Sequence, residues 1–367
     1  MHILITADAM GGVWTYTREL ASGLTKLGAK ITLVSFGEIP APDQTAWVHE
    51  LGIDYRPTAF KLEWMQDCEA DLEDSARFLQ AVIDEVHPDL LHLNQFYYGA
   101  LETAQPKIVV AHSDVVSWFQ EVHGGGPKDA RWGFWYRDMV VRGLSGANAV
   151  VAPTRWMLET VKELFVTPKL GSVIYNGRTP SLFNPHVSKE RYAASAGRIW
   201  DFGKNAALLT KIDPPYVIHL AGCDESPNQG EERQPFFGEG KKVAYRGVLN
   251  EKQIQQLFSR AEVYVATSQY EPFGLAPLEA ALSRCALVLS DIPTFRELWG
   301  DSAVYFERNN PESLQAALTQ MYRDHELRAT YAKLAYDRAT RRYTAQRMSE
   351  EYFEVYKTLI HAGAVAA

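Results

Sequence analysis

The sequence predicts an α/β protein with two successive domains, each built on a parallel sheet of the doubly wound type. The chain opens with an apolar strand, a glycine turn, a helix and a second apolar strand. Short apolar runs then alternate with stretches of helical periodicity along the 367 residues. The alternation breaks once, between residues 178 and 190, where Pro180 and Pro185 interrupt it. We therefore expect domains over residues 1–177 and 178–343, followed by a C-terminal helix within 344–367.

The first domain begins with a strand, then a turn at Met10, Gly11 and Gly12, then a leucine-rich helix that Gly28 ends. Thr154 is the expected N-cap of a later helix. The expected strands cover residues 2–6, 31–36, 89–93, 107–112, 147–152 and 172–175, and the expected helices cover residues 13–27, 72–86, 131–144 and 154–164.

The second domain repeats the alternation and ends in amphipathic helices. The polar stretch over residues 224–240 predicts a mobile loop. The expected strands cover residues 192–196, 216–221, 243–245, 263–266 and 286–289, and the expected helices cover residues 205–212, 254–258, 275–282, 311–322, 326–341 and 345–360.

Composition and charge indicate which partners and which compartment to expect. The formal net charge of -8 disfavours indiscriminate binding to nucleic acid or anionic lipid. The 3 cysteines, Cys68, Cys223 and Cys285, are widely spaced and form no metal-binding pair, which favours reduced thiols in a reducing compartment. The first residues lack a basic leader, and no stretch has the ~20 apolar residues of a membrane span. We expect a cytoplasmic protein.

The strongest functional motif is the string from Ser268 to Leu275, which follows an expected strand and opens an expected helix. Glu271 lies on the loop, and Glu279 lies eight positions later, inside the helix. Two carboxylates so placed can hold separate parts of one extended ligand. The backbone amides of Phe273, Gly274 and Leu275 would be donors at the start of the helix, suited to an anion such as phosphate. Helix capping and surface charge are the alternative interpretation of two such glutamates.

This string resembles the E-x7-E motif of the family 4 retaining glycosyltransferases, and the resemblance extends over nearly the whole chain. It implies the GT-B fold, in which two Rossmann-like domains face each other across a cleft. Residues 347–360 resemble the C-terminal helix that crosses back to the N-terminal domain in that fold. The first domain would bind the acceptor and the second the nucleotide sugar.

The resemblance also implies roles for single residues of the second domain. Glu271 would hold the hydroxyls of the donor sugar, and Glu279 would accept hydrogen bonds from the two ribose hydroxyls. The segment from Gly197 to Asn205 resembles the family's G-R-…-K segment, so Arg198 and Lys204 would hold the diphosphate. Their spacing of six positions is one longer than the commonest family form. Fixed cations there would stabilise the departing diphosphate, and no metal or other cofactor is expected. No Asp-x-Asp motif follows an expected strand.

Further roles follow from the same resemblance. Gly11 and Gly12 fit the glycine loop that faces the diphosphate from the first domain, although most such pairs are simply tight turns. His112 resembles the histidine beside the reacting sugar, with a satisfied strand-end histidine as the alternative. Asn176 lies in the family's hinge segment, where Arg178 and Thr179 replace the usual residues. The nucleotide base would lie near Leu249.

The expected function is therefore retaining transfer of a hexosyl group from a nucleotide-diphosphate sugar, best a UDP-hexose, to a hydroxyl acceptor, by front-side displacement and without a metal. The acceptor class stays open among glycans, lipid-linked sugars and small molecules. Another GT-B enzyme, such as an epimerase or phosphorylase, and a non-catalytic nucleotide-sugar-binding module are the alternatives. A glycosidase fits less well, because its two carboxyls must flank one bond.

Residues 128–137 mix aromatic and basic side chains. Such a stretch can contact a lipid surface or line the acceptor site, which leaves peripheral contact with the inner face of a membrane open. An amphipathic helix packed on its own domain is the other interpretation.

Overall fold

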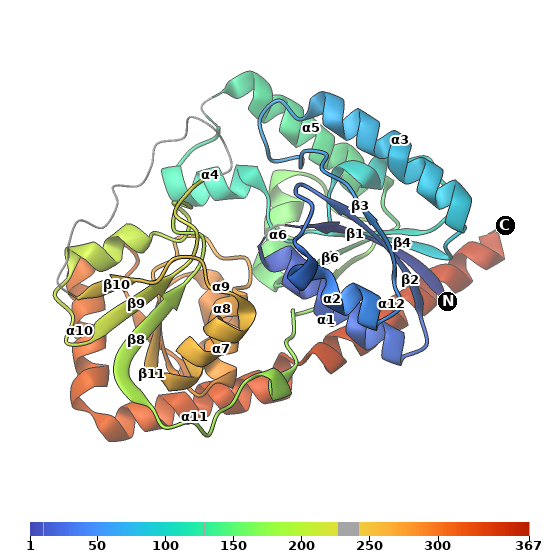
Figure 1. Ribbon diagram of the computed structural model, residues 1–367. Coiled ribbons are helices and arrows are strands. Elements are labelled where there is room, and N and C mark those ends of the chain that lie inside the picture. The colour runs from blue at the N-terminus through green and yellow to red at the C-terminus, as the bar shows by residue number, and fades with distance from the viewer. Residues whose placement is uncertain (10, 128, 227–241, 367) are drawn as a thin grey trace. The chain divides into compact units, whose positions relative to one another are not determined.

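The computed structural model describes residues 1–9, 11–127, 129–226 and 242–366. It divides the chain into two compact units (Figure 1). Unit 1 contains Met1–Gly177 and Ala345–Ala367, and unit 2 contains Arg178–Thr344. Met10, Lys128 and most of the predicted polar loop, residues 227–240, lie outside the described residues. None of the described helices combines the length and the hydropathy that spanning a bilayer requires.

The described residues of unit 1 form a 7-stranded parallel sheet with the strand order β3-β2-β1-β4-β5-β6-β7. The order reverses between β1 and β4, and in such sheets ligands bind at the carboxyl ends of the strands at this reversal. The strands are β1 (His2–Asp8), β2 (Lys30–Phe36), β3 (Asp54–Pro57), β4 (Leu90–Leu93), β5 (Lys107–Val110), β6 (Ala149–Ala152) and β7 (Gly171–Val173).

Helices cover both faces of this sheet (Figure 1). One apolar cluster joins the sheet to α1 (Gly12–Lys26), α2 (Pro42–Glu50) and α12 (Ala345–Ala366). The other joins it to α3 (Glu69–Val86), α4 (Val115–His123), α5 (Ala130–Gly146) and α6 (Arg155–Leu164), with a 3-10 turn, η1, over Tyr97–Ala100. A Cβ on Gly23 of α1 would come 2.0 Å from the Oγ of Ser349, so α1 and α12 pack closely. The C-terminal helix thus returns to unit 1, as the predicted fold class requires.

The described residues of unit 2 form a 6-stranded parallel sheet with the order β10-β9-β8-β11-β12-β13. The order reverses between β8 and β11, so their carboxyl ends are again the expected binding edge. The strands are β8 (Glu190–Ala196), β9 (Val217–Ala221), β10 (Val243–Tyr245), β11 (Ala261–Ala266), β12 (Ala286–Ser290) and β13 (Val304–Phe306).

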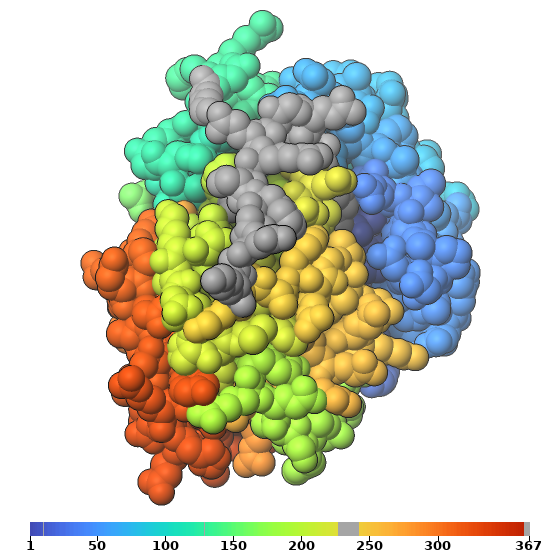
Figure 2. Space-filling model, turned by 60° about the vertical axis from the view of Figure 1, so that its left-hand side comes forward, coloured from blue at the N-terminus to red at the C-terminus, as the bar shows by residue number. Residues whose placement is uncertain are grey.

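Helices α7 (Glu251–Arg260) and α8 (Leu275–Leu282) pack against the central strands of this sheet, near α9 (Pro293–Trp299). The 3-10 helix η3 (Ala206–Lys211) and α10 (Pro311–Arg323) share an apolar cluster with the sheet, and α11 (His325–Arg342) adds to it. Figure 2 shows α10 and α11, in orange, at the surface of unit 2. Two further 3-10 turns, η2 and η4, cover Pro180–Leu182 and Gly300–Ser302.

The sequence patterns missed several elements and misplaced others. The helix expected over residues 205–212 is the shorter 3-10 helix η3. The strand expected over 107–112 ends at Val110, so His112 lies on the loop that follows β5. The patterns gave no element for α2, α4, α9, β3 or β13. In α4 the side chain of Asp114 accepts a hydrogen bond from the backbone of Ser117, and this cap starts a helix despite two β-branched residues at its first positions.

Candidate functional site

Two loops of unit 2 lie side by side at the carboxyl ends of β8 and β11. The backbone N–H of Gln269 donates to the carbonyl of Gly203 at 2.7 Å. The hydroxyl of Thr267 donates to the carbonyl of Lys204 at 3.0 Å. Because these bonds join the loop after β8 to the loop after β11, side chains from both loops reach the same place.

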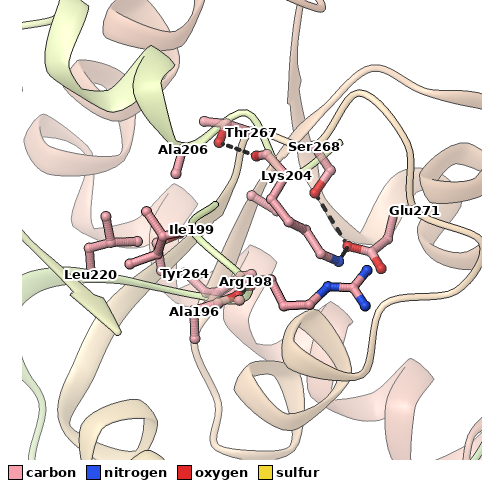
Figure 3. Close-up of a pocket in the computed structure, with 13 residues that line it drawn as sticks. Ala196, Arg198, Ile199, Lys204, Ala206, Leu220, Tyr264, Thr267, Ser268 and Glu271 are labelled. Atoms are coloured by element: carbon pink, nitrogen blue, oxygen red, sulfur yellow. Dashed lines mark hydrogen bonds and ion pairs between the residues drawn. The ribbon is translucent and has the colours of Figure 1, made fainter. Parts of the chain in front are cut away.

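Lys204 and Glu271 meet in the pocket that these loops form (Figure 3). The Nζ of Lys204 donates to Oε2 of Glu271 as an ion pair, and the hydroxyl of Ser268 approaches the same oxygen at 3.3 Å. The two charged side chains are 22% and 11% exposed. Arg198 also lines the pocket, and its side chain extends toward the same end of it in Figure 3. The structure therefore brings three of the predicted site residues together.

Asp201 holds the loop that carries both cations. Its Oδ2 accepts from the guanidinium of Arg198 at 2.8 Å, and its Oδ1 accepts from the backbone N–H of Gly203 at 2.8 Å. Arg198 remains 51% exposed on its side chain, whereas that of Asp201 is 5% exposed. Sequence reasoning gave Asp201 no role. The only signal in the sequence was its spacing, three positions after an arginine and two before a glycine.

Gly274 is the N-cap of α8 and has a φ of 88°, a conformation that favours glycine. A Cβ at Gly274 would come 3.1 Å from the Cγ of Glu271. Phe273 is buried and its ring packs edge-on against Tyr343, so it can contact a ligand only through its backbone. The first N–H groups of α8, starting at Leu275, have no partner within the helix and point toward its N-terminal side.

Glu279 lies inside α8 and is paired with a buried arginine. Its Oε1 lies 3.0 Å from the Nε of Arg178. The side chain of Glu279 is 13% exposed and that of Arg178 is 2% exposed.

Leu249 is half-buried and lies on the loop between β10 and α7, next to exposed residues. Neither Glu279 nor Leu249 lines the pocket that holds Glu271.

Gly11, Gly12, His112 and Asn176 belong to unit 1. Gly11 is the N-cap of α1 with a φ of 69°, and Gly12 is the first residue of that helix. The predicted glycine loop is thus a helix N-terminus at the end of β1. Asn176 is buried, and its carbonyl accepts from Arg347 of α12 at 3.5 Å.

His112 is held in one orientation by Asn94. The amide nitrogen of Asn94 donates to the carbonyl of Thr6 at 2.6 Å, which directs its Oδ1 toward His112. That oxygen lies 2.8 Å from Nε2 of His112, so Nε2 must donate the hydrogen bond. Burial lowers the pKa of His112 to about 3. The ring is therefore neutral near pH 7, and Nδ1 is the nitrogen with a lone pair.

His92, on β4, is fully buried between tyrosines. The hydroxyl of Tyr356 lies 2.7 Å from Nδ1, and that of Tyr16 lies 3.3 Å from Nε2. Burial, with the nearby His112, lowers the pKa of His92 to about 3. His92 thus joins β4 to α1 and α12.

The aromatic and basic segment forms the start of α5, with Asp129 as its N-cap. Trp132 and Trp135 are partly buried against the apolar cluster, and Tyr136 is part of it. Phe134 is 75% exposed. Most of the aromatic surface therefore packs on unit 1 itself, and contact with a membrane stays a prediction.

Metal-ligating groups are scattered through the described ranges. Within 1–9, 11–127, 129–226 and 242–366, no three His, Cys, Asp or Glu side chains gather closely enough to hold a metal ion.

Two family models match the chain, one over most of unit 1 and the first residues of unit 2, and the other within unit 2. Residues 10–182 match the model described as Glycosyltransferase Family 4. Residues 200–338 match the model described as Glycosyl transferases group 1. Among curated relatives, an uncharacterized glycosyltransferase of Methanocaldococcus jannaschii is 22% identical, with 95% of this chain and 94% of the relative covered. The GDP-mannose:cellobiosyl-diphosphopolyprenol alpha-mannosyltransferase of Xanthomonas campestris is 25% identical over 72% of this chain and 73% of its own.

Solved structures share the fold over almost the whole chain. Sucrose-phosphate synthase from Thermosynechococcus elongatus has a TM-score of 0.80 at 15% identity, covering 99% of this chain and 100% of its own. HepE from Anabaena, in complex with UDP-glucose, has a TM-score of 0.75 at 18% identity, covering 98% and 100%. Two parallel-sheet α/β units matched in this way constitute the GT-B fold.

Proposed function

Because the chain belongs to the family 4 glycosyltransferases of the group 1 type, we propose that it transfers a hexosyl group from a nucleotide-diphosphate sugar to a hydroxyl acceptor, with retention and without a metal ion. The observation that carries the proposal is the meeting of Lys204 and Arg198 with Glu271 in one pocket at the carboxyl edge of unit 2. A diphosphate needs cations and a sugar needs hydrogen-bond acceptors, and this pocket offers both side by side.

The proposed reaction is a front-side displacement. The acceptor oxygen bonds to the anomeric carbon on the face from which the diphosphate departs. The bond from that carbon to the phosphate oxygen breaks, and its electron pair stays on the diphosphate, which takes the proton of the acceptor hydroxyl. Negative charge grows on the diphosphate in the transition state, so Arg198 and Lys204 stabilise that state more than the ground state. Glu271 orients the sugar.

A UDP-hexose is the proposed donor. Support comes from the fold shared with HepE, whose structure holds UDP-glucose. The Xanthomonas relative is named for GDP-mannose, which makes a GDP-hexose the second candidate. The base would lie near Leu249, on a loop whose side chains are partly exposed.

The acceptor is proposed to bind to unit 1, at the carboxyl ends of β1, β4 and β5. Gly11 and Gly12 begin a helix there, and His112 presents a neutral ring held by Asn94. A neutral imidazole nitrogen accepts hydrogen bonds from hydroxyl groups, which suits a sugar or polyol. The Xanthomonas relative is named for a diphosphopolyprenol-linked acceptor, so a lipid-linked glycan is the first class to test.

The test is incubation of the protein with UDP-glucose, UDP-galactose, GDP-mannose and ADP-glucose, with release of nucleoside diphosphate as the readout. We expect release from one donor, slow with water and faster with an acceptor. The anomeric configuration of the product, read by NMR, should equal that of the donor. Activity should persist in EDTA.

Each alternative has its own outcome in this assay. A non-catalytic binding module would bind a nucleoside diphosphate in a thermal-shift assay and release none from its sugar. An epimerase would convert the sugar at C2 or C4, and a phosphorylase would require phosphate. Inversion of configuration would overturn the proposed mechanism while leaving the transferase activity in place.

A further inference from the structure

Arg178 is a buried cation at the start of unit 2 that joins two carboxylates from different helices. Its Nε lies 3.0 Å from Oε1 of Glu279 in α8, and one terminal nitrogen donates to Oε1 of Glu251 in α7 at 2.7 Å. Its side chain is 2% exposed, while those of Glu279 and Glu251 are 13% and 38% exposed. Both carboxylates reach more solvent than the guanidinium between them.

The guanidinium has little freedom to move. It lies 5.3 Å from the centroid of the Phe183 ring, and the backbone N–H of Arg178 donates to the carbonyl of Tyr343 at 3.0 Å. A planar guanidinium that is held in this way restricts the positions open to a carboxylate that forms an ion pair with it. Because a carboxylate is planar, holding one oxygen of Glu279 also sets the direction of the other.

We propose that Arg178 is a positioning residue of the donor site, one that orients Glu279 so that its carboxylate accepts the ribose hydroxyls of a nucleoside diphosphate. This rests on the proposed function, in which Glu279 binds the ribose. Arg178 also offsets the negative charge of Glu279, which otherwise opposes the approach of a diphosphate. Through Glu251, the first residue of α7, Arg178 fixes the helix that follows the loop of Leu249.

The test measures how strongly the protein distinguishes a ribose from a ribose without hydroxyls. Dissociation constants are determined by calorimetry for UDP, GDP and ADP and for the 2′,3′-dideoxy form of each. For the wild type we expect the ribose form to bind on the order of 10- to 100-fold more tightly, the range for hydrogen bonds to a charged group. In Arg178→Met the preference should fall to about threefold or less, because an unoriented carboxylate accepts these bonds poorly. Affinity for the dideoxy form should change much less.

Further variants separate positioning from folding. Arg178→Lys keeps the charge and restores part of the preference. Glu279→Gln loses the preference, and Arg178→Met combined with Glu279→Gln loses no more of it than Glu279→Gln does. The matched control is Arg328→Met. Arg328 is another buried arginine of unit 2, bonded to the carbonyl of Met321 and to Glu262 at the other end of β11. That variant should lower the melting temperature and keep the full ribose preference.

The outcomes distinguish this inference from the proposed function. If the wild type binds none of UDP, GDP and ADP, the proposed function fails. If the wild type prefers the ribose forms and Arg178→Met, still folded, keeps that preference, Arg178 is only structural and the inference is overturned. Equal binding of ribose and dideoxy forms by the wild type overturns it as well. Should Arg178→Met not fold, the comparison rests on Arg178→Lys and on Glu251→Gln, which frees one side of the guanidinium and should reduce the preference.

Discussion

Gly274 lies directly over the side chain of Glu271, so that a Cβ at Gly274 would come 3.1 Å from Cγ and 3.3 Å from Cδ of that glutamate. The two residues are three positions apart, on the loop that leads from β11, which ends at Ala266, into α8. Glycine is therefore needed here for two reasons, the φ of 88° and the space that Glu271 fills. The position of the Glu271 carboxylate depends on this space.

Gly274→Ala should reduce turnover without abolishing donor binding. The new methyl group displaces Glu271 by a few tenths of an ångström, and small misplacements of an orienting group cost rate steeply. We expect kcat to fall about tenfold or more, because loss of orientation acts on the reacting geometry. The melting temperature should also fall, since a non-glycine residue at positive φ costs about 1–2 kcal/mol.

Gly28→Ala is the matched control. Gly28 has a φ of 84°, and a Cβ there would meet nothing within 4 Å. It should lose similar stability and keep full turnover. Equal kcat in the two variants would show that Gly274 is needed only for its backbone conformation and not for the space that Glu271 fills.

Arg198→Ala should lower kcat by about 10²–10³, the usual cost of removing one electrostatic stabiliser of the transition state. Asp201, 5% exposed on its side chain, loses its guanidinium partner in this variant, so the free energy of unfolding should also fall, by about 1–3 kcal/mol. Steady-state release of nucleoside diphosphate measures the effect. Arg260→Ala is the control, because Arg260 is 58% exposed and paired with Glu190 at the start of β8, the opposite edge of the sheet. Near-wild-type turnover in Arg198→Ala would remove this residue from the mechanism.

The buried ring of His92 should make the folded state lose stability in acid. Its pKa is about 3 in the folded state and 6.5 in the reference state. Between these values the unfolded chain binds a proton that the folded chain does not. Stability from this group is therefore full above pH 6.5 and is lost as the pH falls toward 3, by about 1.4 kcal/mol per pH unit.

His92→Phe isolates this contribution. At pH 7 the variant should be less stable by about 1–3 kcal/mol, because the hydroxyls of Tyr16 and Tyr356 lose their partner. The difference from the wild type should shrink as the pH is lowered from 6.5 to 5, since the variant has no ring to protonate. Urea unfolding at several pH values measures it. A difference that stays constant would mean that His92 is protonated as readily in the folded chain.

The sequence predicted those elements whose signal lies in residues that are neighbours along the chain. The strand, glycine turn and helix at Gly11 and Gly12 depend on neighbouring residues, and so does the turn that leads from Glu271 to Gly274. Periodicity also located most strands, because buried parallel strands are short apolar runs between turns. Short elements escaped it. Strand β3 contains only Asp54–Pro57. Its residues are exposed or half-buried, so it has no apolar run that periodicity could detect.

Contacts between residues that are distant in the sequence could not be predicted from it. Arg178 was visible only as an unusual residue after Asn176 and Gly177, and nothing in its spacing indicated Glu279, which is 101 positions away. The pairing of Asn94 with His112 is of the same kind, since it depends on β4 and β5 being neighbours in the sheet. These pairs form because the residues are buried, and a polar group inside the protein needs a hydrogen-bonding partner, which the fold supplies.

Lys204 and Glu271 should behave as one unit when they are replaced singly and together. In Lys204→Met the carboxylate of Glu271, 11% exposed, loses its cation, which we expect to cost about 1–3 kcal/mol of stability. Glu271→Gln leaves the ammonium unpaired and should cost somewhat less, because Lys204 is 22% exposed. The double variant should be more stable than the sum of the two losses predicts, since neither charge is then left alone.

Turnover should show the same non-additivity. Either single change should lower kcat by about 10²–10³, and the double change should lower it little further, as happens when residues act on one transition state together. The control is Lys333→Met in α11, where Lys333 and Asp337 form an ion pair at 2.6 Å with side chains 64% and 34% exposed. That pair should contribute less than about 1 kcal/mol and nothing to turnover. Losses in kcat that simply multiply would mean that Lys204 and Glu271 act on the donor independently, and the shared pocket would not be the reason for their roles.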